Sequence, residues 1–99
     1  MKEMEIKRPP AGQTLEEYLA VLESALFDPS NKRVSMRAQG MDINMLVDVA
    51  ARFRDLHDKQ VNIENISTGT IKGLTVKKDT AKNVSWMKIV LVKVDRVRE

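Results

Sequence analysis

Residues 34–48 read VSMRAQGMDINMLVD, and the spacing of the apolar side chains changes in the middle of this stretch. Before Gly40, apolar residues alternate with polar ones, which is typical of a strand with one buried face. The apolar set of this strand is Val34, Met36 and Ala38. After Asp42 the apolar residues recur at helical spacing. The stretch therefore predicts a strand over about 32–38, a break at Gly40 and a helix that Asp42 caps.

Two amphipathic helices are expected. Thr14 begins the first, because its hydroxyl can accept from the Glu17 amide while the Glu17 carboxylate reaches back to the Thr14 amide. Residues 28–31, DPSN, end this helix, and the second runs to about His57. The apolar stripe of the first helix is Leu15, Tyr18, Leu19, Leu22, Ala25 and Leu26. The stripe of the second is Ile43, Leu46, Val47, Ala50, Phe53 and Leu56.

Three further strands surround these helices. A short one is expected at residues 5–7, and another begins at Val61 with a bulge near Glu64-Asn65. The last runs over about 85–94 and contains the unbroken apolar run IVLV at residues 89–92, which predicts burial on both faces. Between the last two strands we expect a long β-hairpin arm whose lysine-rich tip, residues 77–83, is an exposed turn.

These elements define an α/β fold of the order β-α-β-α-β-β. Right-handed crossovers place both helices on the same face of a four-stranded mixed sheet, so the architecture is a two-layer sandwich with a long β-hairpin arm. The 99 residues form one domain, 1–99.

Composition excludes several classes of protein. The chain has no cysteine, which removes disulfides, thiolate metal sites and cysteine nucleophiles, and it has one histidine. No apolar stretch approaches the roughly 20 residues of a membrane helix, and the N-terminal residues do not have the pattern of a signal peptide. We therefore expect an intracellular, cytoplasmic protein with no bound metal or cofactor and no membrane association.

Positive charge is concentrated toward the C-terminus. The net charge of the chain is +3, and residues 59–99 carry nine basic and four acidic side chains, a net charge of +5. An excess of this size points only weakly to an anionic partner, and a solvated polar surface explains it equally well.

No motif in the sequence supports catalysis. His57 lies beside Asp55 and Asp58, but no serine or second histidine has a motif spacing around it, so a structural position at a helix C-terminus is favoured over a general base. We expect no small-molecule substrate. Trp86 faces opposite to Met87 and Ile89, and we expect it to pack in a core or an interface rather than to stack on a base.

Residues 36–48, MRAQGMDINMLVD, together with the order of elements, resemble the Alba family of small archaeal chromatin proteins. Family sequences often read IKARGRAISKAVD at this point. Lys7-Arg8-Pro9 is similar to the Lys-Lys-Pro that precedes the first helix in the family, and Tyr18 is similar to its helix tyrosine.

The resemblance implies a homodimer that binds double-stranded DNA or RNA with little sequence preference and is associated with the chromosome when nucleic acid is bound. In the family, basic residues before the first helix and at the strand–helix junction contact phosphates, and hairpin arms reach toward the minor groove. The positions that match this pattern or lie in the expected arm are Lys7, Arg8, Arg37, Lys72, Lys77, Lys78 and Lys82. The family's acetylation at the lysine pair makes Lys7 the only candidate here.

The departures from the family concern its cations. Gln39, Met41 and Met45 stand where the family has basic residues, and Asp42 adds a negative charge at the same junction. Residues 10–13 resemble an insertion that displaces the basic pair. Affinity for a phosphate backbone follows the number of phosphates neutralised, so binding is expected to be weaker than in the family. The alternative is an Alba-fold dimer that has lost nucleic-acid binding and acts as a scaffold for proteins.

The dimer is expected to form through the last two strands and the end of the second helix. The apolar run at residues 89–92 and Trp86 motivate this expectation, because two short helices do not readily cover so much apolar area.

Overall fold

A computed structural model describes residues 2–77 and 80–94, with side chains described for 2–71 and 84–94. The elements in chain order are β1 (Lys2–Glu5), α1 (Leu15–Leu26), β2 (Arg33–Gln39), a 3-10 turn (Gly40–Asp42), α2 (Ile43–Leu56), β3 (Val61–Lys77) and β4 (Thr80–Lys93). The order β-α-β-α-β-β is therefore confirmed. No helix of the described chain is long and apolar enough to cross a membrane.

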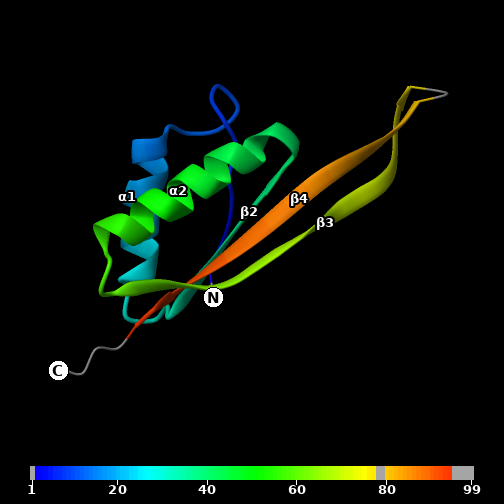
Figure 1. The fold of residues 1–99 in the computed structure, drawn as a ribbon. Helices are drawn as coiled ribbons and strands as arrows, with labels where there is room; N and C mark the ends of the chain where they lie inside the picture. The colour runs from blue at the N-terminus through cyan, green and yellow to red at the C-terminus, as the bar shows by residue number, and fades with distance from the viewer. Residues whose placement is uncertain (1, 78–79, 95–99) are drawn as a thin grey trace.

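The four strands form one mixed sheet in the order β1-β2-β4-β3. β1 and β2 are parallel, and β4 is antiparallel to both β2 and β3. Both helices lie on the same side of the sheet, as expected for a two-layer sandwich (Figure 1). The other side has no helix over it.

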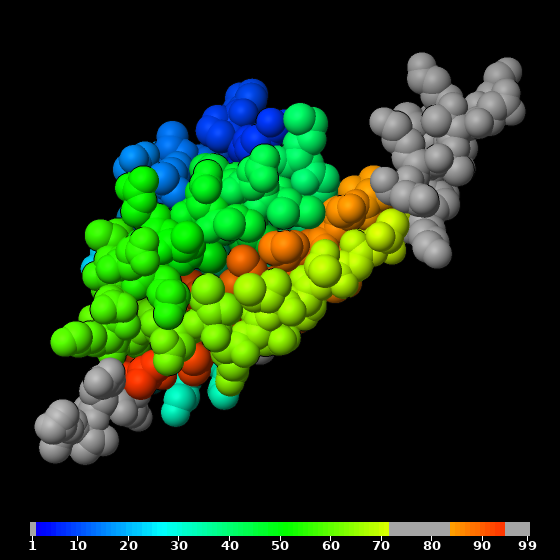
Figure 2. Space-filling model, viewed as in Figure 1, coloured from blue at the N-terminus to red at the C-terminus, as the bar shows by residue number. Residues whose placement is uncertain are grey.

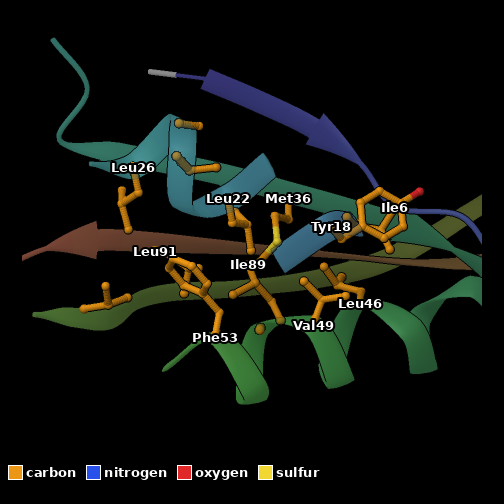
Figure 3. Packing of buried hydrophobic residues seen from close by; sticks show 14 of the residues in the cluster. Ile6, Tyr18, Leu22, Leu26, Met36, Leu46, Val49, Phe53, Ile89 and Leu91 are labelled. Carbon is orange, nitrogen blue, oxygen red and sulfur yellow. The ribbon is translucent and has the colours of Figure 1, made fainter. Parts of the chain in front are cut away.

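The core lies between the two helices and this one side of the sheet. β2 contributes Val34, Met36 and Ala38, all fully buried, as the alternation predicts. Figure 3 shows side chains of both helices meeting those of β2 and β4. The labelled members of this cluster are Ile6, Tyr18, Leu22, Leu26, Met36, Leu46, Val49, Phe53, Ile89 and Leu91.

The buried stripe of α2 differs from the expected one. Val49 is fully buried, whereas Val47 is 43% exposed and Leu56 61% exposed. The sheet contacts positions 46, 49, 50 and 53, so the helix is rotated away from the stripe that includes Val47. Both sets have helical spacing, and periodicity alone does not decide between them.

Glu64 is the extra residue of a β-bulge, which confirms the expected irregularity. Ile63 pairs with Leu91 and Asn65 with Val90, so Glu64 has no partner on β4. Its carboxylate instead accepts from Nε and Nη2 of Arg33 at 2.6 and 2.8 Å. This hydrogen-bonded ion pair joins β3 to β2 across β4, and it holds the pKa of the Glu64 carboxyl below its usual value. The pair therefore stabilises the fold at neutral pH and loses this effect as the carboxylate is protonated in acid.

Two strand boundaries differ from the prediction. β1 spans Lys2–Glu5 rather than residues 5–7, although the Ile6 amide still donates to the Arg37 carbonyl at 2.8 Å. β4 begins at Thr80, so the turn expected over residues 77–83 is wrong. Backbone pairing in the arm continues as far as Lys77 and Thr80. Residues 81–83 are weak strand formers on their own, but β3 opposite them contains strong strand formers such as Thr75, and pairing with β3 makes them part of β4. The molecule is 59 Å long, and the arm extends well beyond the helices (Figure 1).

The capping box at the start of α1 is confirmed. Thr14 Oγ1 accepts from the Glu17 amide at 3.2 Å, and Glu17 Oε1 accepts from the Thr14 amide at 2.9 Å. Thr14→Ala removes the hydroxyl acceptor, so we expect it to lower the free energy of unfolding by about 1 kcal/mol. Thr14→Ser keeps the acceptor and is expected to retain most of the stability. Urea denaturation of the two variants measures the difference, and equal losses would show that the cap is not the cause.

Candidate functional site

The loop between β1 and α1 is fixed by the hydroxyl of Tyr18. This oxygen accepts from the amides of Lys7 at 2.9 Å and Gln13 at 3.3 Å, and it donates to the Lys7 carbonyl at 3.1 Å. The Tyr18 ring itself lies in the core, with 5% of the residue exposed. The Lys7 backbone is therefore attached to the core while its side chain stays exposed.

Gly12 allows the loop to turn back on the basic pair. Its amide donates to the Arg8 carbonyl at 2.9 Å, and a Cβ on Gly12 would overlap the carbonyl of Lys7. The four residues 10–13, which resemble an insertion, thus fold against Lys7 and Arg8, and both of these side chains remain at the surface.

Arg8 lies against the junction between β2 and α2. Its amide and its Nε donate to Oδ1 of Asp42 at 3.1 and 3.3 Å, and its Nη2 lies 4.0 Å from the sulfur of Met41. The expectation that Asp42 caps α2 through its side chain is wrong, because that side chain makes no cap hydrogen bond. The carboxylate is instead directed to Arg8 and offsets its charge locally.

The three positions that lack the family's cations do not share one surface. Met41 is 71% exposed and lies at the junction beside Arg8. Met45 packs partly against the core. Gln39 is opposite Trp86 in the β2–β4 register and so belongs to the side of the sheet away from the helices. Only Met41 lies where a cation would add directly to the charge of Arg8.

Arg37 is also separate from the basic pair. It points to the side of the sheet that the helices leave uncovered, and its guanidinium carbon lies 5.8 Å from the centroid of the Trp86 ring. Of the arm lysines, Lys72 and Lys77 belong to β3 and Lys82 to β4, and Lys78 lies outside the described residues. The arrangement brings together Lys7, Arg8 and Asp42, and places Arg37 elsewhere.

His57 has a structural position. Its ring centroid is 4.6 Å from that of Phe53 and 5.0 Å from that of Phe27, and its amide donates to the Phe53 carbonyl at the end of α2. In the described part of the chain, no three acidic or histidine side chains are grouped as a metal site.

Comparisons with solved structures identify the architecture. Alba from Thermoplasma volcanium superimposes with a TM-score of 0.73 at 20% identity, covering 92% of this chain and 99% of that one. ALBA1 from Trypanosoma brucei gives a TM-score of 0.70 at 21% identity, covering 95% of this chain and 70% of that one. The chain has the Alba fold. No protein-family model and no curated protein matches the sequence.

Within this Alba fold, two features of the site were not predicted from the sequence. One is the contact between Arg8 and Asp42, which are 34 residues apart and have no shared local pattern. The other is Lys88, which lies in the same strand as Trp86 and points to the same side. The alternation of β4 places the two residues on one face, and this signal could have been used.

Tyr18→Phe tests whether the hydroxyl holds the loop in place. The substitution leaves the Lys7 and Gln13 amides without their acceptor, so we expect a loss of about 1–3 kcal/mol in the free energy of unfolding. Hydrogen exchange of these two amides should become faster, whereas exchange of the Phe53 amide in α2 should change only by the global loss. Unchanged exchange at Lys7 would show that the loop does not depend on the tyrosine.

Proposed function

We propose that this Alba-fold chain binds double-stranded DNA or RNA as a homodimer, through the phosphate backbone and without sequence preference. The observation that carries the proposal is the exposed pair Lys7 and Arg8 on a loop that Tyr18 fixes to the core. A fixed loop presents cations without the entropic cost of ordering it on binding. The resemblance of residues 36–48 to the Alba family and the basic C-terminal part of the chain support the same function.

Binding is proposed to be weaker than in the family. Asp42 forms an ion pair with Arg8, so a phosphate must compete with a carboxylate that is already in place. Met41, beside the same arginine, supplies no charge. Each phosphate contact on duplex DNA contributes about 0.9 to the slope of log K against log salt, so one lost contact per subunit is a measurable deficit.

The proposed activity is binding rather than catalysis, with no cofactor and no small-molecule substrate. His57 packs against two phenylalanines and offers no acid–base pair. We place the protein in the cytoplasm and, when nucleic acid is bound, on the chromosome. Lys7 is the proposed position for acetylation, since its side chain is exposed and its backbone is fixed.

The proposed dimer keeps β3 from the surface that the sequence indicated, but not the apolar run at residues 89–92. Ile89, Val90 and Leu91 are already buried within the chain. Among the side chains that the structure describes, the large apolar residues left exposed on α2 and β3 are Val47, Leu56 and Ile66. α2 and β3 lie side by side on one face of the molecule (Figure 2), and β3 is an edge strand. Val47 and Leu56 are nine residues apart and so lie on opposite sides of α2, and only one of them can share a surface with Ile66. We propose that the β3 flank around Ile66 pairs with the same flank of a second copy.

A second candidate function is a dimer that binds proteins instead of nucleic acid. The observation that favours it is the combination of a neutralised Arg8 with the exposed thioether of Met41 at the same junction. Methionine adapts its shape to different partners, and a surface of this kind suits protein contacts better than phosphate contacts.

Asp42→Asn distinguishes the two functions. The amide still offers an oxygen to Arg8 but removes the negative charge. We therefore expect duplex affinity to rise and the salt slope of the dimer to steepen by about 1.8, which is about 0.9 for one regained contact in each subunit. Asp58→Asn, the same change at the other end of α2, is the matched control and should have a much smaller effect. Fluorescence anisotropy with two unrelated labelled duplexes measures both quantities.

The outcome separates the two candidates. Similar gains for both duplexes confirm binding through the backbone. If neither the natural chain nor Asp42→Asn binds a duplex at low salt, duplex binding is rejected and the protein-binding dimer is favoured.

Ile66→Glu tests the dimer. A carboxylate in the centre of an apolar interface must be desolvated, so we expect the variant to sediment as a monomer at micromolar concentration while the natural chain sediments as a dimer. Met41→Glu changes another exposed apolar residue, outside this flank, and should leave the dimer intact. Dimers of unchanged affinity in Ile66→Glu would place the interface elsewhere.

A further inference from the structure

The side of the sheet opposite the helices carries its own set of polar and aromatic residues. In β2 and β4 the core takes alternate residues, so the remaining ones face away from it. No helix of the described chain covers this side (Figure 1). We call it the open face. On the two central strands it carries Arg33, Ser35, Arg37, Gln39, Val84, Trp86, Lys88, Val90 and Val92.

Two cations lie directly opposite each other on the open face. Arg37 of β2 pairs in register with Lys88 of β4. Like charges at directly opposite positions of an antiparallel pair destabilise a sheet. Among the residues that the structure describes, no carboxylate lies within 4.0 Å of either cation, although Glu5 pairs with Arg37 in the β1–β2 register. This face therefore holds two adjacent cations that form no ion pair, with the carboxylates of β1 beside them.

Trp86, the sole tryptophan of the chain, lies beside these two cations. Its ring is laid over Gly69 of β3, since a Cβ at Gly69 would be 2.8–2.9 Å from three of the ring atoms. Because Gly69 has no side chain, the indole packs directly against the β3 backbone, next to the guanidinium of Arg37. The residue is half-buried, so part of the ring remains accessible.

Neutral hydrogen-bonding groups continue the face onto β3. Asn65 and Ser67 are opposite Val90 and Lys88, and the Asn65 amide donates to the Ser67 hydroxyl at 3.2 Å. An aromatic ring, adjacent cations and side-chain amides are the groups that bind single-stranded nucleic acid on sheets: bases stack, phosphates meet the cations, and amides reach base edges.

We propose that the open face binds an unpaired segment of DNA or RNA. One base stacks on Trp86, and the neighbouring phosphates lie against Arg37 and Lys88, which relieves their mutual repulsion. The proposal does not depend on duplex binding, because Lys7 and Arg8 take no part in it.

The acidic residues of β1 limit where the strand lies. A hollow of about 330 Å³ on this face has Glu3 and Glu5 along one wall and Arg37 and Lys88 along another. Phosphates are repelled from the carboxylate wall, so the nucleic acid follows β4 and β3, where Trp86 and the neutral residues lie. An acidic peptide that filled the hollow would lie against Glu3 and Glu5, and these carboxylates would repel it.

Fluorescence of Trp86 tests the proposal directly, since no other tryptophan contributes. We expect an oligouridylate or oligothymidylate of about 12 nucleotides to quench it on titration at low salt. A blunt duplex has no unpaired base to stack and should leave the emission nearly unchanged. Binding is followed in parallel by anisotropy of the labelled oligonucleotide.

Lys88→Gln is the decisive variant. It should weaken binding of the oligonucleotide about fivefold and reduce the salt slope by about 0.7, the value for one phosphate of a single strand. The same variant should raise the urea midpoint, because it removes a like-charge pair. Arg52→Gln on α2 removes an equal charge from the helix side of the molecule. This control should change the affinity, the salt slope and the urea midpoint much less than Lys88→Gln does. A purely structural residue would not give opposite changes in binding and stability.

Trp86→Leu should weaken binding by about 5- to 100-fold, with Lys88→Gln remaining the test if the leucine variant fails to fold. The proposal is overturned if the oligonucleotide leaves Trp86 fluorescence unchanged, if Arg52→Gln has the same effect as Lys88→Gln, or if oligoglutamate of similar length quenches equally well. Each of these outcomes would overturn only the open-face proposal. The proposed duplex binding would still stand if duplex affinity responds to Asp42→Asn and does not respond to Lys88→Gln.

Discussion

The structure depends on the one-sided burial of β2 and its pairing with β4. Val34, Met36 and Ala38 form the floor on which both helices pack, and none of them is exposed to solvent. Because side chains alternate along a strand, β2 directs Arg37 to the other side of the sheet, and β4 directs Trp86 and Lys88 there. Two helices suffice to cover one face of four strands, and so the charged face stays open. The core and the open face are consequences of a single alternation.

Much of the fold follows from local patterns. The capping box at Thr14 and the bulge at Glu64 involve residues close in sequence, and each has a geometric signature that the sequence shows directly. The rotation of α2 is different. Val47 and Val49 both fit a helical stripe, and only the position of the sheet determines that Val49 is buried and Val47 exposed. The helical spacing of apolar residues in α2 is compatible with two rotations of the helix, and packing against the sheet selects one of them.

The candidate site was less predictable than the fold, because its contacts join distant segments. Asp42 has the residue type and position of a helix cap, yet its carboxylate accepts from Arg8, which arrives from a loop 34 residues earlier. The Arg8 amide and guanidinium both donate to this carboxylate oxygen. The resemblance to a family placed Arg8 and Arg37 in one basic surface, whereas strand alternation puts Arg37 beside Trp86. The alternation along β2 shows in the sequence that Arg37 faces away from Met36 and Ala38, and this signal was enough to separate Arg37 from Arg8.

The distribution of charge between the two sides of the sheet has a physical rationale. At the junction, Arg8 is partly neutralised by a carboxylate, so the cost of holding a cation there is small and so is its attraction for phosphate. On the open face, Arg37 and Lys88 repel each other across the β2–β4 pair, and neither forms an ion pair with Glu3 or Glu5, which line the same hollow. Local conflicts of this kind are expected at functional sites rather than at surfaces under selection for stability alone. If the repulsion had no function, a neutral residue at position 88 would pair with Arg37 equally well and stabilise the sheet. Lys88 lies next to the sole tryptophan of the chain. In the proposed complex, a phosphate offsets the charges of Arg37 and Lys88, and a base stacks on Trp86.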